Sequence, residues 1–133
     1  MELILSEETI SSRGMKHCHK TMIKTFKNTV VLTKYWGPVQ MCVYYLEYDY
    51  MPKNYKIILE CERGIITIKV SNQYKNEFSL WMVYPEFRYF HYQDVDKDIK
   101  QLIDLTYIAI NNNETKFYTQ RQITKLSRNI DWD

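Results

Sequence analysis

The middle of the chain follows a two-residue repeat, and this repeat constrains the fold more than any other feature. Apolar and more polar residues alternate over 41–50, over 55–61 and over 66–70, with Gly64 in the short break between the last two. The apolar members are Tyr44, Leu46, Tyr48, Tyr50, Tyr55, Ile57, Leu59, Cys61, Ile66, Ile68 and Val70. Such alternation is typical of strands with one buried and one wetter side. We therefore expect an antiparallel meander.

Helical spacing flanks these strands. The pattern predicts a helix over 15–33, ended by Trp36-Gly37-Pro38, and a second over 94–110, where aspartates favour a helix start. The residues expected to face the core are Met15, His19, Met22, Ile23, Phe26 and Val30 in the first helix, and Ile99, Leu102, Ile103, Tyr107 and Ile110 in the second. We also expect a fourth strand over 77–84 and a short helix over 119–127.

These elements predict one α+β domain over residues 1–133. Its antiparallel sheet has four or more strands, with the N-terminal and C-terminal helices packed against it. At 133 residues and 45% hydrophobic composition, the chain can bury a core without disulfides. No apolar run approaches the roughly 18 residues that span a bilayer. The acidic start at Glu2 is unlike a signal peptide, so we expect a cytoplasmic protein.

Three cysteines and three histidines are the candidates for metal binding or nucleophilic catalysis. His17, Cys18 and His19 are adjacent, but consecutive helical residues point about 100° apart and cannot converge on one ion. Cys18 with His91 would form a nucleophile and base only if the fold brought them together. Glycine-rich phosphate loops and serine-nucleophile motifs are absent from the sequence. We expect no metal, no cofactor and no enzymatic activity; a histidine-dependent enzyme remains the third hypothesis.

Lysines line one side of the first predicted helix. Lys16, Lys20, Lys24 and Lys27 share an arc about 80° wide, and no acid lies between Arg13 and Lys34. Aligned ammonium groups can follow a phosphate backbone or meet an acidic protein surface. The net charge of only +2 argues against direct nucleic-acid binding. A nucleic-acid-binding protein that uses this helix is therefore the alternative hypothesis, beside an ordinary solvated helix face.

The predicted strands carry the opposite charge. Tyr45, Glu47 and Asp49 should point away from the core, and Glu60 and Glu62 of the next strand can join the same surface. Carboxylates interleaved with aromatic rings are suited to a basic protein partner, because charge steers the encounter and the rings supply contact area. An ordinary charged sheet face is the competing interpretation. Pairing of this face with the lysine helix of a second copy would give a homodimer.

The layout resembles the small bacterial immunity proteins of contact-dependent growth inhibition and related polymorphic toxin systems. The resemblance rests on the N-terminal helix, the strands rich in Tyr and Ile over Tyr44 to Val70, and the segment from Asp94 to Leu105 that leads into a helix. It covers most of the chain as a layout and contains no catalytic motif.

The resemblance implies a cytosolic bacterial protein that binds a cognate toxin C-terminal domain, usually a nuclease, and covers its active site or substrate groove. Inhibitors of basic nucleases are often acidic overall, whereas this chain is slightly basic. Either a local acidic patch serves, or the toxin offers an acidic surface to the lysines. The expected contact residues are Tyr45, Glu47, Asp49, Glu60 and Glu62, and, as a second choice, Lys20, Lys24 and Lys27.

Overall fold

The computed structural model describes residues 1–5, 9–71, 77–79 and 91–111. In chain order the elements are α1 (Ile10–Phe26), β1 (Val30–Val39), β2 (Val43–Tyr50), β3 (Tyr55–Glu62), β4 (Ile65–Ser71), β5 (Glu77–Ser79), β6 (Tyr92–Gln93) and α2 (Asp96–Asn111). Short 3-10 turns lie at Lys27–Thr29, Gln40–Cys42 and Met51–Lys53. The predicted α+β class, with a helix on each side of a strand meander in the sequence, is confirmed.

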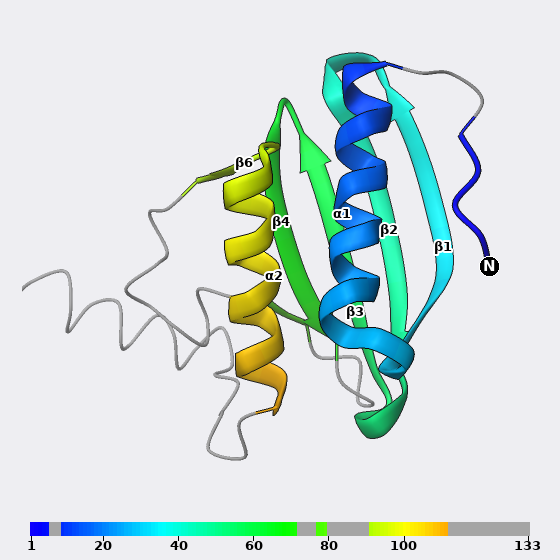
Figure 1. The fold of residues 1–133 in the computed structure, drawn as a ribbon, viewed down its shortest axis with the longest axis vertical. Coiled ribbons are helices and arrows are strands. Elements are labelled where there is room, and N and C mark those ends of the chain that lie inside the picture. The colour runs from blue at the N-terminus through cyan, green and yellow to red at the C-terminus, as the bar shows by residue number, and fades with distance from the viewer. Residues whose placement is uncertain (6–8, 72–76, 80–90, 112–133) are drawn as a thin grey trace, which may run out of the picture.

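The strands form one antiparallel sheet in the order β1-β2-β3-β4-β5, and β6 pairs with the part of β4 that β5 leaves free. Both helices lie on the same face of this sheet, as Figure 1 shows. There α1 contacts β1 and β2, α2 contacts β4 and β6, and the two helices contact each other. We call the opposite side of the sheet the open face, because neither α1 nor α2 covers it.

Alternation along β2 confirms the predicted direction of its side chains. Tyr44, Leu46, Tyr48 and Tyr50 are buried, and the residues between them are only partly buried. The buried set packs with apolar residues of α1, α2 and the neighbouring strands into one core. The odd-numbered residues of β2 therefore point to the open face.

The predicted end of the first helix is wrong. Instead of continuing to residue 33, α1 stops at Phe26, and Lys27 takes a left-handed φ of 57°. The next residues, from Val30, form the ten-residue strand β1, which includes Trp36-Gly37-Pro38. Valines and threonines in this run lose side-chain freedom in a helix and pack well in a sheet. Its apolar spacing alone could not separate these two outcomes.

The predicted start and core side of this helix also need correction. The helix begins at Ile10 because Thr9 and Ser12 form a capping box: the Ser12 amide donates to Thr9 Oγ1 at 3.1 Å, and the Thr9 amide donates to Ser12 Oγ at 2.7 Å. Cys18 is fully buried, whereas Ile23 is 40% exposed. The buried residues of α1 are Ser12, Met15, Cys18, Met22 and Phe26, so the core side is rotated from the predicted one.

Two further predictions lie partly or wholly outside the described residues. Of the fourth strand expected over 77–84, the structure describes β5 at Glu77–Ser79. The short helix expected over 119–127 lies outside the described residues.

The helix expected over 94–110 is observed as α2, from Asp96 to Asn111. In the described part of the chain, neither helix combines the length and apolar character required to cross a bilayer.

Candidate interaction surfaces

The strand register arranges the open face in rows. Directly opposed residues of antiparallel strands share one side of a sheet. One row therefore runs from Trp36 on β1 through Tyr45 on β2 and Glu60 on β3 to Thr67 on β4. Since Tyr45 points away from the helices, the whole row belongs to the open face. The register thus joins the predicted residues Tyr45 and Glu60, and it adds Trp36, which the helical prediction had placed elsewhere.

Two of the predicted carboxylates are already engaged within the sheet. The Tyr45 hydroxyl donates to Glu47 Oε1 at 2.7 Å. Lys56 Nζ lies 2.9 Å from Asp49 Oδ1 and 3.7 Å from Glu47 Oε2, and these acids raise the pKa of Lys56, chiefly through the hydrogen bond to Asp49. The Glu47 side chain is only 18% exposed. The two carboxylates of this half of the open face are therefore partly compensated by one shared lysine, and they offer fewer free acceptors.

The other half of the open face keeps its acidic groups available. Neither Glu60 nor Glu62 has an ion-pair partner among the residues that the structure describes. Both line a shallow hollow of about 330 Å³, which the cationic side chain of Arg63 also lines. Exposed apolar groups lie beside them, with Trp36 53% and Ile65 37% exposed. We name as the open-face patch Trp36, Tyr45, Glu60, Glu62, Ile65 and Thr67.

The predicted lysine arc is divided by the fold. Lys20 and Lys24 line a groove of about 550 Å³ between α1 and α2, whereas Lys27 lies beyond the end of α1. On the far wall of the groove, α2 presents Asp96 and Asp104. The sequence showed no acid near the lysines because these aspartates are distant along the chain. The lysine side of α1 is therefore not a purely basic surface.

The histidines and cysteines do not assemble a site of the kinds considered from the sequence. Among the described residues, no three His, Cys, Asp or Glu side chains are placed to hold one metal ion. His19 Nδ1 is hydrogen-bonded to the Tyr48 hydroxyl at 2.8 Å, and burial lowers the pKa of His19. His17 Nε2 instead lies 3.4 Å from Asp96 Oδ1. Cys18 is fully buried, and burial raises the pKa of its thiol to about 12, so it stays protonated and is a poor nucleophile.

A compact polar junction lies where α1, β2 and the start of α2 meet. Cys18 Sγ is 3.2 Å from the Tyr44 hydroxyl. The Asp94 carboxylate lies against the Gly14 backbone, so that a Cβ on Gly14 would be 2.7 Å from Asp94 Cγ. Burial raises the pKa of Asp94, and the Tyr44 hydroxyl beside it lowers that pKa in part. This junction links α1, β2 and the segment that leads into α2.

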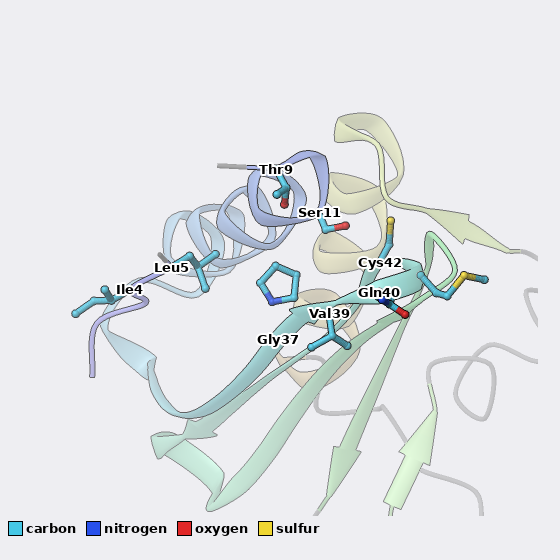
Figure 2. A pocket seen from close by; sticks show the side chains of 10 residues that line it. Ile4, Leu5, Thr9, Ser11, Gly37, Val39, Gln40 and Cys42 are labelled. Atoms are coloured by element: carbon cyan, nitrogen blue, oxygen red, sulfur yellow. The ribbon is translucent and has the colours of Figure 1, made fainter. Parts of the chain in front are cut away.

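A cavity of about 570 Å³ lies at one end of the sheet, between the N-terminal segment, the start of α1 and the β1–β2 connection (Figure 2). It is lined by Ile4, Leu5, Thr9, Ser11, Gly37, Pro38, Val39, Gln40, Met41 and Cys42. The connection turns through Met41 and Cys42, both with left-handed φ angles, of 68° and 56°. With no charged side chain among these ten, the cavity offers apolar contact and neutral hydrogen-bonding groups only.

Sequence reasoning missed several of these surface residues. Trp36 and Ile65 were not identified because the first was assigned to a helix end and the second to a hairpin break. Tyr107 was expected in the core but lines the groove beside α1. Pairing of strands and helices that are distant in sequence decides all three positions.

Comparison of the chain with protein-family models, with curated proteins and with solved structures gives no match.

Proposed function

We propose that this chain is a non-enzymatic inhibitor of the immunity-protein type, and that it binds a toxin domain with the open-face patch. The observation that carries the proposal is the row Trp36–Tyr45–Glu60, which places two large aromatic rings and a carboxylate in register on the side that the helices leave uncovered. Tryptophan and tyrosine are enriched among the residues that dominate binding energies.

Charge decides the class of partner. Glu60 and Glu62 form no ion pair among the described residues, although Arg63 lines the same hollow, while the neighbouring Glu47 and Asp49 share Lys56. A partner that brings lysine or arginine side chains to Glu60 and Glu62 gains attraction that the chain itself does not satisfy. Nucleases bind a polyanionic substrate through basic surfaces. A nuclease domain of a bacterial toxin therefore has the chemistry that this patch complements.

The alternative use of the lysine helix for nucleic acid receives less support. A continuous phosphate backbone that follows Lys20 and Lys24 would also pass the carboxylate of Asp96 on the other wall of the groove, and no lysine or arginine pairs with that carboxylate among the described residues. Repulsion between the like charges opposes binding and weakens the electrostatic gain expected from aligned lysines. We therefore place the lysine helix outside the main binding surface.

The test is binding of the full chain to the C-terminal domain encoded by the gene immediately upstream, measured by calorimetry with purified proteins. We expect a tight 1:1 complex in which the domain loses its toxic activity. The variant Glu60→Lys/Glu62→Lys should lower the affinity at least about 100-fold, because it replaces attraction by repulsion at the interface.

The matched control is Glu47→Gln/Asp49→Asn, which removes two carboxylates from the same face. Because Glu47 and Asp49 already interact with Lys56, and Glu47 also with Tyr45, the control should change the affinity by less than about fivefold. Circular dichroism establishes that both variants are folded. The proposal is wrong if the domain does not bind, or if charge reversal at Glu60 and Glu62 leaves the affinity unchanged.

A further inference from the structure

The groove between the helices has two walls of different character. The helices α1 and α2 run side by side in the same direction along one face of the sheet (Figure 1). The α1 wall carries His17, Lys20, Thr21, Lys24 and Thr25; the α2 wall carries Asp96, Lys100, Asp104 and Tyr107. The volume of about 550 Å³ lies within the range of small-molecule sites.

One of the two aspartates on the α2 wall, Asp104, is paired with a lysine inside the groove. Lys100 Nζ lies 2.9 Å from Asp104 Oδ2, and Asp96 Oδ1 lies 3.4 Å from His17 Nε2. Lys20 and Lys24 differ: among the described residues, neither has an ion-pair partner. They are four residues apart, so both ammonium groups project from one side of α1. The local imbalance is therefore positive and is concentrated on these two lysines.

An aromatic ring bounds the groove on the α2 wall. The Tyr107 ring packs edge-to-face against Phe26, with centroids 5.2 Å apart and planes at 76°. This contact restrains the ring, yet the residue stays 39% exposed. Any of the nucleobases can stack on an exposed aromatic face of this kind. The groove therefore joins a restrained aromatic face to two lysines that form no ion pair with any described residue.

We propose that this groove binds a nucleoside monophosphate, with the phosphate between Lys20 and Lys24 and the base against Tyr107. A phosphate dianion accepts charge-assisted hydrogen bonds from both ammonium groups. The Asp104 carboxylate does not oppose it strongly, because Lys100 is held against that carboxylate. A single phosphate needs only the two lysines, whereas a longer strand would extend toward Asp96. The site is independent of the proposed inhibitor function, because it lies on the helix side and the open-face patch lies on the other.

The experiment is calorimetric titration of the full chain with the monophosphates of adenosine, guanosine, cytidine and uridine, each compared with its nucleoside and with inorganic phosphate. At least one monophosphate should bind about tenfold or more tightly than both of its parts. Lys20→Ala/Lys24→Ala should weaken this binding at least about tenfold. Tyr107→Leu should weaken the monophosphate but leave the weak binding of inorganic phosphate unchanged.

The matched control is Lys97→Ala, which removes an exposed lysine of α2 that does not line the groove. It should bind the monophosphate as the wild-type chain does. The proposal is overturned if none of the four monophosphates binds, if the nucleoside or inorganic phosphate binds equally well, or if Lys20→Ala/Lys24→Ala binds normally. Glu60→Lys/Glu62→Lys should retain nucleotide binding, so the failure of one function is distinguishable from failure of the other.

Discussion

Replacing Gly14 by alanine tests the junction that links α1, β2 and the segment that leads into α2. Gly14 lies inside α1, where alanine normally stabilises a helix by about 1 kcal/mol. Here the new methyl group would overlap the Asp94 carboxylate, because the Cβ position of residue 14 is only 2.7 Å from Asp94 Cγ. The Asp94 backbone cannot retreat freely, because its amide donates to the Gly64 carbonyl at 2.8 Å.

The two effects have opposite signs, and the steric effect should be the larger. Forcing an extra methyl group into a packed site costs about 1–3 kcal/mol. After the helical gain, Gly14→Ala should lower the free energy of unfolding by up to about 2 kcal/mol. When Asp94 is also alanine, the obstacle is gone, and the same change should raise that free energy by roughly 0.5–1 kcal/mol.

The assay is urea denaturation of four proteins: wild type, Gly14→Ala, Asp94→Ala and the double variant. The coupling free energy from this cycle should equal the steric cost, about 1–3 kcal/mol. A Gly14→Ala variant that is more stable than wild type would refute the packing argument. So would an equal effect of Gly14→Ala in both backgrounds, because it would show that the two residues do not meet.

Three further outcomes follow from burial. Burial raises the folded-state pKa of Asp94, so the contribution of this residue to stability is most favourable below the unfolded pKa and is lost as pH rises through the folded pKa. Urea midpoints of wild type relative to Asp94→Asn should therefore fall as the pH rises above about 4, the usual aspartate pKa. In the native state, thiol reagents should label the part-exposed Cys42 well before the buried Cys18; equal rates would contradict this. Met22→Ala should cost about 2–5 kcal/mol and Ile23→Ala less than about 1 kcal/mol, measured by thermal denaturation.

The strand meander could be predicted from the sequence because its signal is local. A strand such as β2 shows which side is buried through alternation alone, and Tyr44 and Tyr48 are indeed buried. The start of α2 was also visible within two residues, since its aspartates favour a helix N-terminus. Each of these predictions depends on neighbours along the chain, for which sequence patterns are informative.

The sequence did not predict β1 or the make-up of the surfaces, because distant segments decide both. Pairing with β2 makes Val30–Val39 a strand, and the same pairing moves Trp36 beside Tyr45. The sequence could not show that Glu47 has a lysine partner and Glu60 has none among the described residues. That difference arises because the folded sheet places Lys56 near Glu47. Sequence patterns identified the charged residues correctly and could not identify their partners.

Carboxyl-group labelling of the chain, read by mass spectrometry with and without the bound toxin domain, tests the main proposal most directly. If the open-face patch is the binding surface, labelling of Glu60 and Glu62 should fall strongly in the complex, while labelling of the exposed Asp96 on the helix side stays constant. Unchanged labelling of Glu60 and Glu62 together with protection of Asp96 would contradict the account and place the partner on the helices.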